Sequence, residues 1–144
     1  MGATPPFRIE RLAGHDRKAF TSGEPSIDRW FQSMASQQTS RGLSVVHVLI
    51  DQSTERVAGF YTLSSYTARA LDLPDLGGKK LPQAMPIPLH LIGQLGVHRP
   101  YQGQGIGKML VNHALKLAES QTRDSASLGV VVHALDARLA AWYQ

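Results

Sequence analysis

A glycine-rich segment decides the fold: residues 99–108 read Arg-Pro-Tyr-Gln-Gly-Gln-Gly-Ile-Gly-Lys. Before it, residues 90–97 form a largely apolar run, which predicts a buried strand with glycines where a bulge or a close ligand is tolerated. After it, apolar residues at helical spacing predict one buried helix stripe: Ile106, Met109, Leu110, His113, Ala114 and Leu117. A strand, a glycine loop and a helix in this order bind phosphate groups at the helix N-terminus.

The three glycines of this loop let successive N–H groups turn toward one point without interference from a Cβ atom. Two common phosphate-binding motifs are excluded. A Walker A loop needs a glycine where Gln102 stands and a Ser or Thr where Met109 stands. The dinucleotide fingerprint needs a glycine at the position of Lys108. The loop therefore predicts a pyrophosphate site of another kind, and a tightly packed glycine turn is the alternative.

The rest of the chain predicts an α/β fold with a mixed sheet and helices between the strands, in a single domain over residues 1–144. Strands are expected at 7–12, 43–50, 56–68 and 127–134, with a hairpin loop at 51–55. Helices are expected at 25–35 and 136–143, the second capped by Asp136. Four prolines and paired glycines and lysines predict an exposed excursion at 71–88.

The length, composition and net charge of the chain exclude several classes of functional site and favour anionic partners. With 144 residues, 42% of them hydrophobic, the chain is long enough to bury a core without disulfides. It has no cysteine, which excludes a cysteine nucleophile, a Cys-ligated zinc and a redox dithiol. Its histidines show no metal-ligand spacing, so no metal is expected. The net charge of +4 favours anionic partners, with a solvated basic surface as the alternative. No signal or membrane segment is found, so we expect a cytoplasmic protein.

Residues 102–107 match the Arg/Gln-x-x-Gly-x-Gly/Ala signature and resemble the GNAT superfamily of acetyl-coenzyme A-dependent N-acetyltransferases. Segments 20–31, 59–63, 95–97 and 140–143 extend the resemblance to the GNAT toxins of bacterial toxin–antitoxin pairs. The resemblance implies the GNAT acyl-CoA N-acyltransferase fold. It also implies an enzyme that acetylates the α-amine of aminoacyl-tRNA and so blocks translation.

The resemblance also implies roles for individual residues. The strand residues Leu95, Gly96 and Val97 would pair with the pantetheine arm of acetyl-CoA. The pyrophosphate would be held by Gln102, Gly103, Gln104, Gly105, Ile106, Gly107 and Lys108. Tyr143 would protonate the departing coenzyme A thiolate. Asp136 stands where many relatives place an asparagine, which favours helix capping over cofactor contact. Because the α-amine of an aminoacyl ester is weakly basic, no dedicated base is expected, and Glu24, Asp28 and the histidines are interpreted as structural or solvated residues.

Basic residues predicted in loops or at element ends are candidates for contact with tRNA phosphates: Arg41, Lys79, Lys80 and Arg99. Solvated surface charge is the alternative for each, and Arg8, Arg11, Arg17 and Lys18 are alternatives that would serve a dimer groove. The resemblance implies a homodimer and a cognate antitoxin with a ribbon–helix–helix DNA-binding part. It also implies a further strand after Tyr143, which lies beyond the given sequence.

Two other functions remain open at this point. The same fold would serve an acetyltransferase whose acceptor is a polyamine, an antibiotic amine or a protein N-terminus. A non-catalytic module that binds acetyl-CoA, RNA or a partner protein is the second alternative. The net positive charge weighs against a cationic small acceptor, and the intact glycines and Tyr143 weigh against a non-catalytic module.

Overall fold

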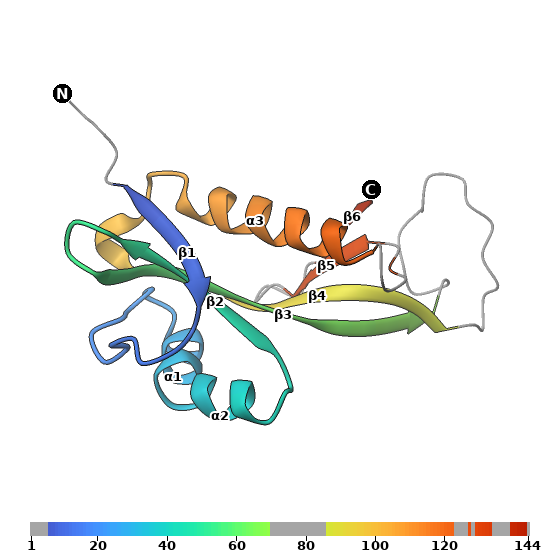
Figure 1. Ribbon diagram of the computed structural model, residues 1–144, viewed down its shortest axis with the longest axis horizontal. Coiled ribbons are helices and arrows are strands. Elements are labelled where there is room, and N and C mark those ends of the chain that lie inside the picture. Colours follow the sequence, from blue (N-terminus) through green and yellow to red (C-terminus); the bar gives the residue numbers. More distant parts are fainter. Residues whose placement is uncertain (1–5, 70–85, 123–126, 128, 134–138, 144) are drawn as a thin grey trace.

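The computed structural model describes residues 6–69, 86–122, 127, 129–133 and 139–143, and their strands form one six-stranded sheet in chain order. All neighbouring strands are antiparallel except β4 and β5, which are parallel. Helix α3 covers one face of the sheet, and α1 and α2 cover the other (Figure 1). The elements are β1 (Phe7–Arg11), α1 (Pro25–Ser33), α2 (Ala35–Ser40), β2 (Val45–Asp51), β3 (Arg56–Arg69), β4 (Pro86–Val97), the 3-10 helix η2 (Arg99–Tyr101), α3 (Ile106–Gln121), β5 (Gly129–His133) and β6 (Leu139–Tyr143).

The mixed sheet predicted from sequence is confirmed, and each expected strand overlaps an observed one. Two boundaries differ from expectation. The helix expected over 25–35 is divided at Met34, whose φ of −112° interrupts the helical backbone between α1 and α2. The excursion expected at 71–88 ends earlier, because residues 86–88 already pair with β3 as the start of β4; residues 70–85 lie outside the described residues.

The helix expected over 136–143 is wrong, since residues 139–143 form strand β6. Every residue of β6 pairs with a residue of β5, from Gly129 opposite Tyr143 to His133 opposite Leu139. This pairing supplies partners to backbone groups along the edge of β5 that faces away from β4. Tertiary pairing therefore overrides the helical preference of the Leu-Ala-Ala run at 139–141. The capping role expected of Asp136 lies outside the described residues.

Alternating strand residues build two cores, one on each face of the sheet. On the α3 face, Leu49 and Ile92 pack with Ile106 and Leu110 of α3. The helix buries Ile106, Leu110, Ala114 and Ala118, so the predicted stripe is right at three positions, whereas Met109 is 38% exposed. On the other face, three aromatic side chains form the centre of the core: Phe20, Phe31 and Phe60, with the Phe31 and Phe60 rings stacked at 4.1 Å.

Two glycines let the helices approach the sheet closely. A Cβ atom on Gly59 would lie 3.0 Å from Leu110 of α3, and one on Gly96 would lie 3.0 Å from Ile27 of α1. Gly59 is in β3 and Gly96 is in the adjacent strand β4. Helices α3 and α1 therefore pack closely against opposite faces of the sheet near the end of β4.

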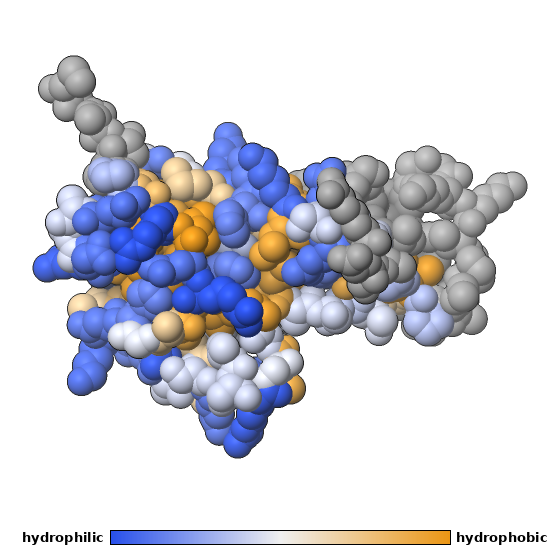
Figure 2. Space-filling model, in the orientation of Figure 1, coloured by the Kyte–Doolittle hydropathy of each residue, from blue (hydrophilic) through white to orange (hydrophobic). Residues whose placement is uncertain are grey.

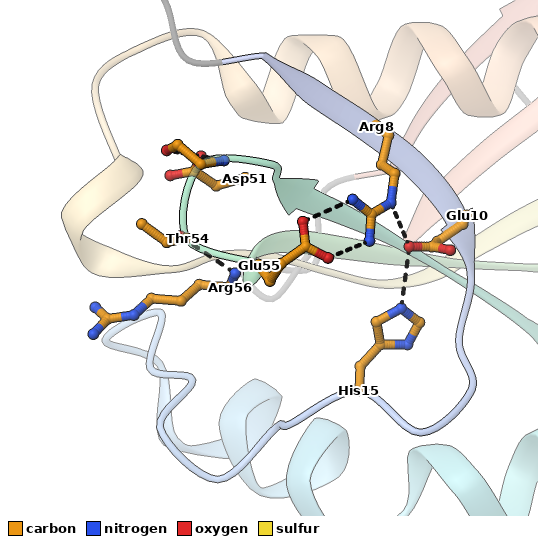
Figure 3. Close-up of polar contacts among 8 residues, drawn as sticks. Arg8, Glu10, His15, Asp51, Thr54, Glu55 and Arg56 are labelled. Atoms are coloured by element: carbon orange, nitrogen blue, oxygen red, sulfur yellow. Dashed lines mark hydrogen bonds and ion pairs between the residues drawn. The ribbon is translucent and has the colours of Figure 1, made fainter.

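The outer strand β1 carries a charged cluster that joins it to the β2–β3 loop (Figure 3). Arg8 contacts Glu55 at 2.7 Å and Glu10 at 2.8 Å, and His15 lies 3.3 Å from Glu10. Hydrophilic side chains dominate this face of the molecule in Figure 2, with hydrophobic ones visible between them. The two carboxylates thus balance the charge of Arg8 within the protein.

No helix among the described residues has the length and apolar character required to cross a bilayer.

Candidate functional site

The glycine loop turns into α3 through two residues with left-handed backbone. Gly103 has φ of 81° and Gly105 has φ of 80°, a region that disfavours side chains with a Cβ. Gly105 is the N-cap of α3, and its carbonyl accepts the first helical hydrogen bond, from Met109 N–H at 3.1 Å. The first N–H groups of α3 therefore lack partners in the helix, and the positive end of the helix dipole lies in this loop.

The loop is open to solvent on the side where a ligand would lie. Neither Gly103 nor Gly105 has any atom within 4 Å of the position that a Cβ would take. Gln104 and Lys108 are also exposed. Exposed, left-handed glycines beside free helical N–H groups form the kind of concave site that holds an anion.

Tyr101 anchors the start of the loop to the opposite hairpin. Its hydroxyl donates a 2.5 Å hydrogen bond to Oδ2 of Asp51, at the end of β2. The Ser53 hydroxyl, followed by the Tyr101 hydroxyl, holds the pKa of Asp51 below its usual value. Burial and the same contact raise the pKa of Tyr101. At neutral pH Asp51 is therefore a carboxylate and Tyr101 a protonated phenol. The hydrogen bond between them is charge-assisted and strong.

Gln102 connects the loop to two other parts of the site. Its side-chain amide donates to the carbonyl of Ser22 at 2.7 Å and to the carbonyl of Val97 at 2.9 Å. Ser22 belongs to the segment before α1, and Val97 is the last residue of β4. Gln102, which is predicted to bind phosphate, thus also has a structural contact. Its amide fixes the position of the loop relative to Ser22 and Val97.

Asp28 has the structural role expected from the sequence. It accepts hydrogen bonds from the Ser22 N–H and the Ser22 hydroxyl, both at 2.8 Å, and from the Thr21 hydroxyl at 3.2 Å. The segment that Asp28 orders also contacts the end of β4, since Thr21 carbonyl accepts from Arg99 N–H at 2.8 Å. Its carboxylate is occupied by these contacts.

The end of β4 presents backbone groups to an edge that no other described strand covers. His98 N–H donates to the Ala58 carbonyl at 2.8 Å, which places residues 98 and 58 in a hydrogen-bonded pair. Because such pairs alternate in antiparallel strands, the N–H and C=O groups of Leu95 and Val97 point away from β3. Among the described residues, pairing of β4 with β5 covers only residues 90–92. An extended ligand therefore has main-chain partners in the N–H and C=O groups of Leu95 and the N–H of Val97, whose carbonyl already accepts from Gln102, whereas Gly96 faces β3.

A β-bulge interrupts β4 just before this edge. Three residues of β3, from Tyr61 to Leu63, lie opposite the four residues from Ile92 to Leu95, so β4 accommodates one extra residue. The hydroxyl of Thr62 accepts the hydrogen bond of the Gln94 N–H at 2.9 Å, in place of a backbone carbonyl. Bulges of this kind bend a strand and redirect its groups, and they occur often beside functional sites.

The match to known proteins agrees with this geometry. The family described as Acetyltransferase (GNAT) family matches residues 9–144. The chain belongs to the GNAT acetyltransferase family. It is 34% identical over 143 residues to a protein named tRNA-acetylating toxin from Mycobacterium tuberculosis, covering 99% of this chain and 82% of that protein.

Two solved structures of the toxin AtaT have a fold similar to that of this acetyltransferase. The AtaT complex with acetyl-methionyl-tRNAfMet has a TM-score of 0.81 and 27% identity, with 90% of this chain and 79% of that chain covered. A variant AtaT toxin bound to the C-terminus of the antitoxin AtaR and acetyl-CoA has a TM-score of 0.74 and 27% identity. Its match covers 90% of this chain and 76% of that one. The described backbone thus follows that of GNAT toxins over most of its length.

Not all predicted site residues of this acetyltransferase are brought together. The backbone of Tyr143 pairs with Gly129, beside Val130, whose partner on β4 is His90. Trp142 therefore lies level with His90, and Tyr143 lies level with residue 89, six residues and about 20 Å along the strand from Leu95. The structure does not bring Tyr143 to the glycine loop.

Of the predicted tRNA-contacting residues, Arg41 and Arg99 lie among the described residues. Arg99 lies beside the loop, with its guanidinium 3.0 Å from the Cβ position of Gly23, and Arg41 is exposed at the end of α2. Lys79 and Lys80 lie outside the described residues. Of the residues expected alternatively at a dimer groove, Arg8 is paired with carboxylates and Arg17 donates to the Phe31 carbonyl at 2.9 Å.

Sequence reasoning missed a group of three rings on the α3 face, of which His47 and Tyr61 are buried and His113 is partly buried. The Tyr61 hydroxyl and His113 Nδ1 form a 2.7 Å hydrogen bond, and the His47 ring stacks on Tyr61 at 5.0 Å. Burial, reinforced by His113 and Arg11, lowers the pKa of His47 to about 4. Burial also raises the pKa of Tyr61. A single polar residue within an apolar strand, such as His47 in β2, is the available signal, but it does not reveal the pairing. Among the described residues, no three acidic, histidine or cysteine side chains group as a metal site.

Proposed function

We propose that the protein is an acetyl-CoA-dependent toxin that acetylates the α-amine of aminoacyl-tRNA and thereby blocks translation. The observation that carries the proposal is the joint presence of an exposed left-handed glycine loop at α3 and an uncovered, outward-pointing edge at the end of β4. The 34% identity to a tRNA-acetylating toxin supports the choice of acceptor.

The residues present fit acetyl-CoA. The N–H groups at the start of α3 and the flexible backbone of Gly103 and Gly105 suit a pyrophosphate. Outward-pointing backbone groups of Leu95 and Val97 suit the amides of a pantetheine arm, which pairs as a strand would. Lys108, exposed in the first turn of α3, adds positive charge near the same place. When bound, acetyl-CoA supplies the acetyl thioester.

The chain's own residues then have modest tasks. They must hold the reacting carbonyl in a fixed orientation, direct N–H groups toward the oxygen that gains charge, and deliver a proton to the leaving sulfur. The α-amine of an aminoacyl ester is weakly basic, so much of it is already neutral without a dedicated base. On family resemblance we assign the proton to the Tyr143 hydroxyl, which requires that hydroxyl to reach the edge of β4.

The proposed partners follow the same likeness. AtaT has been solved with acetyl-methionyl-tRNAfMet and with the C-terminus of the antitoxin AtaR. For this chain we propose tRNA as the acceptor, a cognate antitoxin with a ribbon–helix–helix part, and a homodimer. Arg41 and Arg99, exposed and without an acidic partner among the described residues, would contact tRNA phosphates. Lys79 and Lys80 would contribute to the same electrostatic attraction.

Incubation with acetyl-CoA radiolabelled in the acetyl group and a pool of charged tRNAs tests the proposal. Label should enter aminoacyl-tRNA and should not enter the same tRNA after deacylation. Label that enters spermidine or a peptide N-terminus instead would establish a different acceptor. Tyr143→Phe should keep acetyl-CoA affinity but lose about two orders of magnitude or more in turnover. Unchanged turnover in this variant would remove Tyr143 from the mechanism while leaving the acceptor assignment intact.

A further inference from the structure

A cavity of about 600 Å³ lies under the C-terminal half of α3, apart from the glycine loop. Its wall includes Leu117 and Gln121 from the last turns of α3, Leu63 from β3, and Arg11 at the end of β1. Since the glycine loop stands at the first turn of α3, the two sites lie at opposite ends of a helix about 24 Å long. The volume is within the range of small-molecule binding sites.

Two buried polar atoms without partners belong to residues of this cavity. Among the described residues, Ser44 Oγ and His47 Nδ1 are the buried side-chain polar atoms that lack a hydrogen bond, and both residues line the cavity. His47 is only 8% exposed. A buried polar atom that has lost water without gaining a partner costs free energy, so such atoms call for an explanation. A bound molecule with hydrogen-bonding groups would satisfy both.

The charges around the cavity favour an anion. None of the described residues that line it is an Asp or a Glu. Arg11 has no ion pair among the described residues, whereas Arg8 on the same strand is paired with Glu10 and Glu55. An exposed arginine without an ion pair in the described part of the chain therefore lines a cavity that has no acidic residue among its described lining.

The remaining wall is suited to an organic body rather than to an inorganic ion. Leu63 is part of the buried core and Leu117 packs against it, which gives the cavity an apolar side. Burial lowers the pKa of His47 to about 4, so this ring is uncharged at physiological pH. His90 is held by Gln121 at 3.1 Å and by Ser127 at 2.9 Å, so this polar end is preorganised.

We propose that this cavity is a second ligand site, which binds a small organic anion with its carboxylate or phosphate against Arg11 and its apolar body against Leu63 and Leu117. Ser44 and His47 supply the buried hydrogen-bonding groups. The site is independent of acetyl transfer, since it shares no lining residue with the glycine loop or with the uncovered edge of β4.

Titration of the full chain with three aromatic probes of similar size, followed by amide and histidine NMR shifts, tests the site. Benzoate carries a carboxylate, phenyl phosphate carries a phosphate, and benzamidine carries a cation on the same ring. At least one anion should bind saturably and shift the signals of Ser44 and His47, and benzamidine should not. Binding of benzoate alone or of phenyl phosphate alone would identify which anionic group the cavity prefers.

Substitutions of Arg11 test whether the anionic probe binds in this cavity. Arg11→Gln should weaken the binding of the anionic probe at least tenfold, and Arg11→Lys should weaken it less. Arg29→Gln, which removes an exposed arginine from α1 on the other face, should leave it unchanged. The wild-type amide spectrum outside the cavity serves as the folding check for each variant. If Arg11→Gln does not fold, the Arg11→Lys measurement and the benzamidine comparison still decide the result.

Three outcomes would overturn the proposal: no saturable binding of either anion, equal binding of benzamidine, or affinity unchanged by Arg11→Gln in a folded protein. Displacement of the probe by acetyl-CoA would also overturn it, because the probe would then be reporting the glycine loop. Failure of aminoacyl-tRNA acetylation has no bearing on these measurements, so the two proposals are tested separately.

Discussion

Gln102 and Ser22, eighty residues apart in sequence, are joined by a 2.7 Å hydrogen bond from the side-chain amide of Gln102 to the main-chain carbonyl of Ser22. The same amide reaches the Val97 carbonyl at 2.9 Å. One side chain thus connects the glycine loop, the segment before α1 and the end of β4. The geometry of the candidate cofactor site depends on this connection.

Gln102→Ala should loosen that connection. Loss of two hydrogen bonds at an exposed position should lower the free energy of unfolding by about 1 kcal/mol and weaken acetyl-CoA binding. Urea denaturation and calorimetric titration with acetyl-CoA measure the two effects. Gln37→Ala is the matched control, because Gln37 is an exposed glutamine on α2, outside the glycine loop. Equal effects of the two substitutions would contradict the anchoring role.

Gly105→Ala should impair acetyl-CoA binding by more than its effect on stability explains. A Cβ at φ of 80° costs about 1–2 kcal/mol, and it would also stand where the pyrophosphate is expected. Gly42→Ala is the control, since Gly42 has φ of 70° and is equally open but lies far from the loop. Both variants should lose similar stability, and only Gly105→Ala should lose cofactor affinity. Loss of affinity in both would attribute the effect to general destabilisation.

Gly96→Ala should destabilise the protein by about 1–3 kcal/mol through overpacking. The added methyl would lie 3.0 Å from both Ile27 and Phe60, so α1 would have to move away from β4. Thermal or urea unfolding measures the loss. Gly14→Ala should be neutral or slightly stabilising, because a methyl there meets no atom within 4 Å. A stable Gly96→Ala protein would show that α1 is not tightly packed on this strand.

Arg41→Gln and Arg99→Gln should each weaken tRNA binding in a sequence-independent way. If each arginine contacts one phosphate, the slope of log affinity against log salt should fall by about 1 per substitution. Filter binding across a salt series measures this slope. Arg8→Gln is the control because Glu10 and Glu55 already balance the charge of Arg8. A slope that changes equally in all three variants would indicate a diffuse effect of net charge.

Stability should fall as the pH is lowered from about 6.5 to about 4. Burial lowers the pKa of folded His47 to about 4 from its ordinary 6.5, so in this window the unfolded chain binds a proton that the folded chain excludes. Above pH 6.5 both states are neutral at this residue and the penalty is absent. His113, whose pKa burial also lowers, adds to the effect.

His47→Phe should reduce this acid sensitivity while retaining the stack on Tyr61. Urea midpoints at pH 7 and pH 5 for the wild-type protein and for this variant give the comparison. The midpoint should fall less in the variant between these two pH values. A fall as large as in the wild-type protein would place the sensitivity on other groups.

Local patterns in the sequence were sufficient for most of the elements. The apolar run at 90–97, the glycines of 99–108 and the stripe of α3 predicted a strand, a loop and a helix, and all three are confirmed. Positive φ at Gly103 and Gly105 is a local consequence of lacking a Cβ atom, so it too follows from residue type.

Only the tertiary structure decided the features that depend on contacts between distant segments. Residues 139–143 adopt a strand because the edge of β5 offers backbone partners, a fact that no local propensity contains. The contacts from Gln102 to Ser22, from Tyr101 to Asp51 and from His113 to Tyr61 each join residues about fifty or more positions apart. Sequence spacing determines which face of its own element a side chain occupies, whereas its partner depends on how the sheet brings separate elements together.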